Sequence, residues 1–591
     1  PRASTSARDG RNPPFSSFMA SSDTSRQMPR SPMMANQSKL PRLPLPSLDD
    51  SLERYLAAVQ PIVPAEQYER TKLLVHDELQ AGSELRRLHA SLEVEDAMCS
   101  EPSFVANAWD AMYLEGRWPL PINTNPGVFF SDLSFSKQAT TQVQRAARVI
   151  AASVAVVQKV ETGELSPQLL LGTIPIDMRQ YLKAFAASRQ PRRSRDVLHK
   201  ASQPSKVCHV LVLRREHFWI LPVIDSSSGQ PLSVAALEAA LQHICDQSDA
   251  APSVAEGASS PVSLAALTTA DRDTWADARS KLEEHSAVNA TNLAAINDAL
   301  FQVCLDAKVV GDDLEATVRN ALCGDNTVAP RWFDKSTSMM VTQDGVPMYS
   351  FEHSWGDGVV MSRMMNEVFE KIRADAAAEG AAAVSSVPAR KAAAWPPRKL
   401  DWDIPPAVEA AKLKAAAAYE LTCNALRLGC LDFDSWGVTQ LKRWKIFPDG
   451  AIQAALQLAF FRTQGHTPST YESCSTAHFS AGRTETIRSA TSESVAFVRS
   501  VVEGFSITEQ AERLRASASR HAVVAREAAE GKGFDRHLFV LQALASPTNA
   551  FFSDPTYATL CGNELSTSGV RGEDAALLVA AGPVHPKGFC V

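Results

Sequence analysis

A histidine stands in a glycine-containing connection between a predicted strand and a predicted helix. The segment "FEHSWGDGVVMSRMMNEVFEKI" covers residues 351–372 and continues the short apolar run "VPMYSF" of residues 346–351. Apolar residues then recur at helical spacing, at Val359, Val360, Met364, Met365, Val368, Phe369 and Ile372. His353 and Asp357 therefore lie where a strand passes into a helix, a position that often presents side chains to a ligand. Local capping or hydrogen bonding is the commoner role of a single turn histidine, so this motif alone does not decide a function.

Basic side chains gather in "GVTQLKRWKIFPDG", residues 437–450. Lys442, Arg443 and Lys445 stand close together before a predicted helix start at Pro448-Asp449. Cations grouped in this way can hold phosphate groups. The segment lacks the glycine pattern of a Walker loop, which argues against a nucleoside triphosphate site. A solvated basic face is the alternative interpretation of this segment taken alone.

Three further segments are dense in hydroxyl and arginine side chains. In "TYESCSTAHFSAGRTETIRSAT", residues 470–491, these groups suit a small, polar, charged ligand. In "GKGFDRHLFVLQAL", residues 531–544, Arg536 opens an apolar helix, and a buried arginine needs an anionic partner. The Ser-Thr-Ser of "NELSTSGV", residues 563–570, could donate hydrogen bonds to an oxyanion. A polar surface loop and a plain Ser/Thr turn are the alternatives for the first and the last segment.

Composition limits the class of protein. The 591 residues have a net charge of −7 and an isoelectric point near 6.1, which argues against a dedicated nucleic-acid binder. The ten cysteines form no CxxC pair, so they suggest neither a metal site nor a disulfide framework and favour a reduced compartment. No run approaches the roughly 18 uncharged apolar residues of a membrane-spanning helix.

The chain is too long for one ordinary domain, so we expect two domains or one large two-lobed unit. Residues 1–38 are rich in Ser and Arg, a composition typical of a transit peptide or of a disordered leader. Ordered structure is expected from residue 40, and Ser47 with Asp50 marks the first helix start.

Helix and strand patterns alternate after this helical segment, which favours an α/β or α+β class. The run "HVLVLRREHFWILPVI", residues 209–224, predicts two strands around a charged turn. Low-complexity breaks stand at 248–263 and 376–398, and the second is the best candidate for an exposed loop between halves. We therefore expect a helical segment at 39–95 that can pack on the second lobe, a first lobe at 96–398 and a second lobe at 399–591.

From about residue 40 to its end, the chain resembles the choline/carnitine acyltransferase family. The segments that carry this resemblance are "LPRLPLPSLDDSLERYL", "RWFDKS", "FEHSWGDGV", "TYESCSTAHF", "GRTETIR", "GFDRHLF" and "LSTS". The forms "HSWGDG" and "TYESCSTA" are most similar to its long-chain, inner mitochondrial branch. The resemblance implies two similar α/β lobes of the chloramphenicol acetyltransferase type, each a mixed sheet flanked by helices, with an active-site tunnel between them. It also implies reversible acyl transfer between CoA and carnitine, with no permanently bound cofactor and no metal.

The same resemblance implies roles for individual residues. His353 would be the general base that deprotonates the carnitine hydroxyl or, in the reverse direction, the CoA thiol. Asp357 would orient its imidazole, and Ser568 would stand at the oxyanion. The residues implied to contact carnitine are Tyr471, Ser473, Thr484, Arg536 and Ser566, with Arg536 paired to the carboxylate. Those implied to bind CoA are Gly437, Lys442, Arg443, Lys445 and Asp449.

Some positions agree with the family pattern and others depart from it. The chain keeps "RTET" and Arg536, which choline-using relatives alter, so carnitine is the expected acceptor and choline the minor alternative. Val438 stands where a CoA-binding lysine is expected, and residues 160–181 lack an insert thought to contact the membrane. The family pattern continues beyond a segment like "LLVAAGPVHPKGFCV", so the second lobe is expected to be truncated or altered at its end, while small Ala580 and Ala581 leave room for a long acyl tail.

We therefore expect a long-chain carnitine acyltransferase of fatty acid transport and β-oxidation, whose partners are long-chain acyl-CoA and L-carnitine. The expected location is mitochondrial, in the matrix or on the matrix side of the inner membrane. A monomer is expected, and peripheral membrane association stays open because of the short insert. The alternatives are a medium- or short-chain carnitine acyltransferase and a catalytically impaired acyl-CoA-binding protein.

Overall fold

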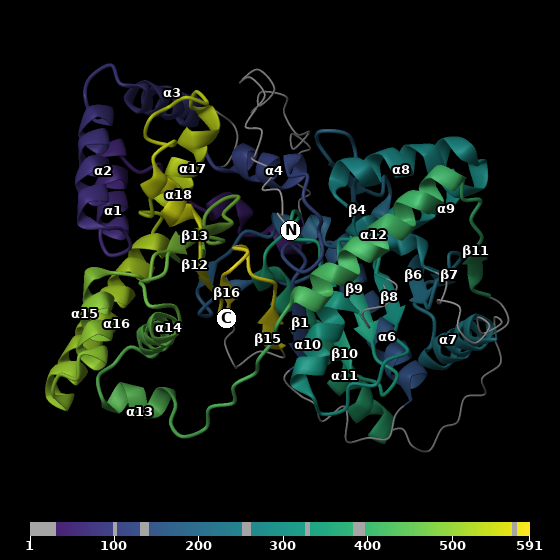
Figure 1. Ribbon diagram of the computed structural model, residues 1–591. Coiled ribbons are helices and arrows are strands. Elements are labelled where there is room, and N and C mark those ends of the chain that lie inside the picture. The colour runs from purple at the N-terminus through teal and green to yellow at the C-terminus, as the bar shows by residue number, and fades with distance from the viewer. Residues whose placement is uncertain are drawn as a thin grey trace.

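The computed structural model describes residues 31–98, 103–130, 141–250, 262–324, 331–381, 396–569 and 576–591. Figure 1 shows two mixed sheets with helices around them, which confirms the predicted α/β class. The sheets differ in size, since one has eight described strands and the other four. The expected likeness of two lobes, and a tunnel between them, stay predictions.

The larger sheet has the strand order β11-β7-β6-β8-β9-β10-β1-β15. β8 pairs in parallel with β6 and β9, whereas the other neighbours are antiparallel. The hairpin predicted at 209–224 is confirmed, because β6 and β7 pair with Leu213 opposite Phe218. The strands are β1 (Gly127–Phe130), β6 (His209–Arg214), β7 (His217–Pro222), β8 (Gln302–Leu305), β9 (Thr337–Val341), β10 (Pro347–Phe351), β11 (Arg398–Leu400) and β15 (Ala576–Ala580).

Both faces of this sheet are buried, because side chains alternate in direction along each strand. In β6, Val210 and Val212 enter one apolar core, whereas Leu211 and Leu213 enter the other. The first core contains α6 (Gln142–Glu161), α7 (Val234–Asp249) and α11 (Gly358–Ala381). The second contains α8 (Arg272–His285), α9 (Ala287–Asp298), α10 (Leu314–Cys323) and α12 (Pro406–Ala425).

The smaller sheet has the order β13-β12-β14-β16. Its strands are β12 (Thr470–Ser475), β13 (Thr484–Ile487), β14 (Leu565–Thr567) and β16 (Phe589–Cys590). β12 pairs antiparallel with β13 and parallel with β14. The helices that pack together beside it are α13 (Val438–Arg443), α14 (Pro448–Gln464), α15 (Ser492–Val502) and α16 (Ile507–Ala529).

The N-terminal helices pack beside the smaller sheet. The first helix begins where predicted, since the Ser47 side chain accepts a hydrogen bond from the backbone N–H of Asp50. Tyr55 shares an apolar core with Phe534 and Leu538. The helices of this layer are α1 (Leu48–Val59), α2 (Ala65–Glu78), α3 (Glu84–Met98), α4 (Ala106–Glu115), α17 (Asp535–Leu544) and α18 (Pro555–Cys561).

Two boundaries differ from those expected. Ordered structure begins before residue 40, because Met33 and Met34 fill part of the first core; residues 1–30 of the expected leader lie outside the described chain. β11 spans the expected boundary after residue 398 and α12 follows it, but both belong with the larger sheet, because β11 pairs with β7 and Tyr419 of α12 is buried in the second core. Most of the breaks at 248–263 and 376–398 lies outside the described residues.

In the described part of the chain, two short hairpins lie outside these sheets. They are β2 (Leu169–Leu170) with β3 (Ile174–Pro175), and β4 (Ala187–Gln190) with β5 (Val197–Lys200). Short 3-10 helices cover Pro32–Met34, Gln37–Lys39, Arg179–Lys183, Pro204–Lys206 and Leu264–Thr269. Within the described ranges, no helix combines the length and the apolar character needed to cross a membrane.

Candidate active site

His353 lies in the connection between β10 and α11, as the sequence predicts. Its imidazole stacks on the ring of Tyr113 from α4, with ring centroids 5.6 Å apart. The ring of Phe351 lies 5.3 Å from the imidazole. The histidine side chain is 28% exposed, so aromatic contacts hold the ring while one part of it stays accessible.

A buried network of charges anchors this turn. The carboxylate of Glu352 accepts a hydrogen bond from Arg189 at 3.1 Å, and Arg189 also pairs with Asp196 at 2.8 Å. Arg272 then joins Asp196 to Asp334, with both distances 2.6 Å. Asp334 belongs to the "RWFDKS" motif, so this chain of ion pairs connects the motif to Glu352, the residue before His353. Buried charges of this kind must be paired, because an unpaired one is strongly destabilising.

Asp357 lies beside His353 but makes no direct hydrogen bond with it. Its Oδ1 is 3.8 Å from the imidazole Nδ1, which exceeds ordinary hydrogen-bond length. The carboxylate accepts instead from Arg483 Nε at 2.8 Å and from Gln180 Nε2 at 3.1 Å. Burial opposes charge on this carboxyl group, but the Arg483 guanidinium and His353 hold the pKa of Asp357 below its ordinary value. Asp357 is therefore a charged group held mainly by Arg483.

Arg483 ties the connection between β12 and β13 to the histidine turn. Its guanidinium donates to the backbone oxygens of His353 at 3.1 Å and Ser354 at 3.2 Å. The same group lies 5.5 Å from the ring centroid of Trp109 and 6.0 Å from that of Tyr113. Cation–π attraction of this kind favours a fixed guanidinium position. One arginine thus joins the two sheets at the turn that carries His353.

Arg536 lies in the first turn of α17, and its guanidinium lies over Trp109, 4.6 Å from the ring centroid. Its Nε donates to the backbone oxygen of Thr484 at 2.7 Å, and its Nη2 lies 3.2 Å from Thr484 Oγ1. Burial opposes its charge, but Tyr471 and Glu485 raise the pKa of Arg536 above its ordinary value. Three residues that the sequence predicted for carnitine, Tyr471, Thr484 and Arg536, are therefore brought together.

The predicted serines lie on or next to the strands of the smaller sheet. Ser566 of β14 stands opposite Tyr471 in the parallel pairing with β12. Ser473 stands opposite Thr486 and is exposed, as is Ser568 just after β14. The backbone N–H of Ser568 donates to the Val591 oxygen at 3.0 Å. No hydrogen bond joins Ser568 to His353 among the described residues, so its role at an oxyanion stays a proposal.

α13 carries the predicted phosphate-binding residues at the surface. Gly437 is the N-cap of this helix, and Lys442 and Arg443 form its last turn. Lys445 follows in a left-handed conformation with φ of 58°, which turns the chain toward α14. All four residues are exposed, and Asp449 lies in the first turn of α14.

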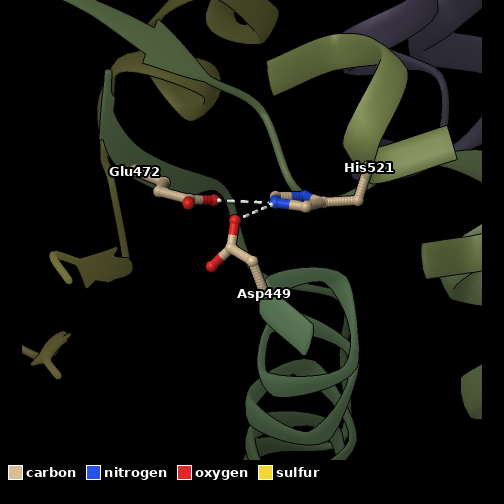
Figure 2. A group of neighbouring side chains, drawn as sticks. All are labelled: Asp449, Glu472 and His521. Carbon is tan, nitrogen blue, oxygen red and sulfur yellow. Dashed lines mark hydrogen bonds and ion pairs between the residues drawn. The ribbon is translucent and has the colours of Figure 1, made fainter. Parts of the chain in front are cut away.

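Asp449 meets Glu472 of β12 and His521 of α16 (Figure 2). The His521 Nε2 lies 2.9 Å from Asp449 Oδ2 and 3.5 Å from Glu472 Oε2. Burial raises the pKa of Glu472 to about 7. Burial opposes charge on His521, but the two carboxyl groups raise the pKa of this imidazole. Burial and ion pairing therefore favour the protonated forms of Glu472 and His521 in the folded chain, while the imidazole of His521 lowers the pKa of Asp449.

β12 separates two groups of residues, because successive side chains of a strand point to opposite faces. Glu472 faces His521 and Asp449, and so contacts the helices next to the basic segment. Tyr471 interacts with Arg536 of α17. The residues predicted for CoA and those predicted for carnitine thus lie on opposite sides of one strand.

Several residues of this site were not selected from the sequence. Trp109 and Tyr113 occur in "ANAWDAMYLEGR", a stretch whose pattern indicates an apolar helix face, and Gln180 lies in the short 3-10 helix Arg179–Lys183. Arg483 belongs to the "RTET" motif, but the motif does not predict the contacts of this arginine with the His353 turn. Local pattern carries no signal for these roles, because every partner comes from a distant part of the chain.

This arrangement suits acyl transfer, because the accessible imidazole can act as a base and the guanidinium and hydroxyl groups can donate hydrogen bonds to negatively charged oxygens. Residues 43–591 match the family model described as choline/carnitine o-acyltransferase. The chain therefore belongs to the choline/carnitine O-acyltransferase family, as the resemblance implied, and it is an acyltransferase.

Its relatives include proteins with different acyl groups in their names. The mitochondrial carnitine O-palmitoyltransferase 2 of Mus musculus is 34% identical over 597 residues, which cover 94% of this chain and 87% of that protein. The Homo sapiens protein of the same name is 34% identical over 599 residues, covering 95% of this chain and 87% of that protein. The carnitine O-acetyltransferase of Mus musculus is 31% identical over 573 residues, covering 94% and 87%.

Proposed function

We propose that this acyltransferase moves a long-chain fatty acyl group between CoA and L-carnitine. The observation that supports this most directly is the continuous set of contacts from His353 through Arg483 and Trp109 to Arg536. It connects a base to a guanidinium that suits a carboxylate, and carnitine carries both a hydroxyl and a carboxylate.

In this mechanism, His353 acts as a general base. It takes the proton of the carnitine hydroxyl while the hydroxyl oxygen attacks the thioester carbonyl carbon. Collapse of the tetrahedral intermediate breaks the C–S bond, and the imidazolium returns the proton to the CoA sulfur. The carbonyl oxygen bears the transient negative charge, for which Ser568 is the proposed donor. No covalent bond to the protein forms. In the reverse direction, the same imidazole takes the proton of the CoA thiol and returns it to the carnitine oxygen.

Asp357 acts in this proposal through Arg483. Its carboxylate fixes the guanidinium, and the guanidinium holds the backbone oxygens of His353 and Ser354. The negative charge beside the ring also favours the imidazolium that forms during the reaction. Asp357 is therefore a positioning residue with an electrostatic effect on the base.

Each substrate is assigned to one side of β12. Carnitine would contact Arg536, Thr484 and Tyr471 through its carboxylate, with Ser473 and Ser566 nearby. CoA would lie on the side of α13 and α14, with its phosphates on Lys442, Arg443 and Lys445. Gly437 and Asp449 border that position, and Val438 removes one positive charge from it.

Relatives named as palmitoyltransferases favour the long-chain substrate, and their mitochondrial names favour a mitochondrial location in fatty acid metabolism. A shorter acyl group is the second candidate, because a relative named as an acetyltransferase is nearly as similar to this chain.

The test is the release of free CoA thiol from palmitoyl-CoA by the 591-residue chain, with L-carnitine present and absent. Carnitine-dependent release is expected, and choline, which lacks the carboxylate, should not replace carnitine. Octanoyl- and acetyl-CoA measured in parallel decide the acyl length. Faster turnover with a shorter acyl group would contradict the long-chain assignment, and acyl-CoA binding without any turnover would favour the impaired acyl-CoA-binding protein.

A further inference from the structure

A short polar segment, residues 177–180, contacts both the His353 turn and the connection from β12 to β13. It leads from the hairpin of β2 and β3 into the 3-10 helix Arg179–Lys183. Its backbone is held in place, because Met178 is buried in the first apolar core. None of its residues belongs to the positions proposed for carnitine or CoA, so the proposed function leaves this segment without a role.

The start of the segment holds the connection from β12 to β13. The carboxylate of Asp177 is buried and accepts a hydrogen bond from the backbone N–H of Ala481 at 2.6 Å. Arg179 pairs with Asp177 and donates to Ser480 Oγ at 2.9 Å. The buried charge is therefore paired, as a buried carboxylate requires. This pair fixes the connection two residues before Arg483.

The end of the segment holds the histidine turn through the side-chain amide of Gln180. Its Oε1 accepts the backbone N–H of Asp357 at 2.9 Å, and its Nε2 donates to Asp357 Oδ2 at 3.1 Å. The same Nε2 lies 3.4 Å from the backbone oxygen of Gly482. Only this orientation of the amide gives each oxygen a donor and the N–H an acceptor. One side chain thus joins the turn of the base to the residue before Arg483.

These contacts fix the rotation of the Asp357 carboxylate. Its Oδ2 accepts from both Gln180 and Arg483, whereas its Oδ1 lies 3.8 Å from the Nδ1 of His353. Two donors on one oxygen leave the other oxygen toward the imidazole. The space around the amide is tight, since a Cβ atom at Gly356 would come within 3.1 Å of the Gln180 Oε1. The carboxylate is therefore oriented by two side chains, of which Arg483 supplies charge and Gln180 supplies direction.

We propose that Gln180 is a positioning residue for the general base. It fixes the Asp357 carboxylate and the backbone of the His353 turn relative to the connection that carries Arg483. A negative charge held beside the ring favours the imidazolium that forms when the base takes a proton. The inference rests on the proposed acyl transfer, because it assigns Gln180 a part in that reaction. The alternative is a brace that stabilises the fold without affecting the base.

The first experiment measures carnitine-dependent thiol release by the full chain carrying Gln180→Ala. The kcat should fall roughly 10-fold, because a hydrogen bond to a charged group is lost. Both KM values should stay nearly unchanged, since Gln180 lies outside the positions proposed for the two substrates. Gln230→Ala is the matched control, because Gln230 is exposed between β7 and α7. An unchanged kcat in Gln180→Ala, or KM values that rise as much as kcat falls, would overturn the proposal.

A second variant, Gln180→Glu, separates positioning from bracing. Glutamate keeps the size of the side chain and the acceptor for the Asp357 N–H, but it sets a carboxylate against the Asp357 carboxylate. The turnover of Gln180→Glu relative to the unchanged chain should be lowest at high pH. It should recover as the pH falls, because a protonated carboxyl group can donate a hydrogen bond again. A ratio that is constant with pH, as expected for Gln230→Glu, would favour the brace.

A third measurement does not depend on turnover. Denaturant unfolding of Gln180→Ala, of Asp357→Ala and of the double variant measures the coupling between the two side chains. We expect effects that do not add, because each single substitution already removes the shared hydrogen bond. Additive effects would overturn the proposal whatever the activity of the chain. Absence of carnitine-dependent release in the unchanged chain would instead reject the proposed function, so the two failures are distinguishable.

Discussion

At the scale of single residues, the site depends on how the imidazole of His353 is held. Stacking on Tyr113 and the backbone contacts of Arg483 fix the ring and its turn from two sides. Asp357 does not reach the ring with a hydrogen bond, so its contribution is the charge that it presents and the arginine that it holds. The effect of His353 on turnover can therefore be separated by mutation from the effect of the residues that hold its turn in place.

Replacing His353 with Ala should lower carnitine-dependent turnover by ~10²–10⁴-fold, because a positioned base is lost. Acyl-CoA binding, measured by calorimetry, should change little, since the proposed CoA residues lie on and around α13 and α14 and not on the His353 turn. His76→Ala is a matched control, because His76 is exposed on α2. Near-normal turnover in His353→Ala would refute the assignment of this residue.

Replacing Arg536 with Ala should raise the KM for carnitine roughly 10- to 100-fold, which corresponds to a lost hydrogen bond to a charged group. The KM for acyl-CoA should change far less. Arg536→Lys should recover part of the loss, because it keeps the charge but not the paired N–H donors. Similar changes in both KM values would instead indicate a general structural role, which thermal unfolding of the variants can verify.

At the scale of elements, the connection between β12 and β13 sets the position of Arg483. Gly482 stands just before this arginine, and a Cβ atom at Gly482 would come within 1.8 Å of the backbone oxygen of Thr476. The backbone of the connection cannot give way without moving the strands on either side. A single methyl group here therefore acts on the histidine turn through Arg483.

Gly482→Ala should lower the free energy of unfolding by roughly 1–3 kcal/mol, the usual cost of overpacking. Turnover should fall as well, because Arg483 can no longer hold the backbone of the His353 turn. Gly429→Ala is the control, since a Cβ atom there meets no atom within 4 Å. Denaturant unfolding compares the two variants, and equal stability would contradict the steric argument.

At the scale of the whole molecule, buried titratable groups couple folding to pH. The pKa of Glu472 rises from 4.5 to about 7 on burial next to Asp449 and His521. Between pH 4.5 and about pH 7, the folded chain therefore binds more protons at this site than the unfolded chain does. The stability that Glu472 contributes is complete below pH 4.5 and is lost as the pH rises through about 7. The raised pKa of His521 acts with the same sign.

Glu472→Gln should remove the loss of stability that accompanies rising pH, because the glutamine amide stays neutral. Its stability relative to the unchanged chain should increase from pH 5 to pH 8, by at most about 1.4 kcal/mol per pH unit within the window. Denaturant unfolding at several pH values measures the difference. Glu503→Gln, at an exposed position after α15, should show no such trend. A difference that is constant with pH would contradict the assigned pKa direction.

The sequence by itself determined the family, the α/β class, the strand and helix around His353, and the grouping of Tyr471, Thr484 and Arg536. The class and the elements follow from local pattern, whereas the family and the grouping of these three residues follow from the resemblance of motifs that are spread along the chain. Only the tertiary structure decided that β11 and α12 join the larger sheet, that Met33 and Met34 fill its core, and that Trp109 and Tyr113 connect the base to the two arginines. It also decided that Asp357 pairs with Arg483. The physical reason is that burial and ion pairing depend on which distant segments come into contact, and local sequence periodicity does not encode these contacts.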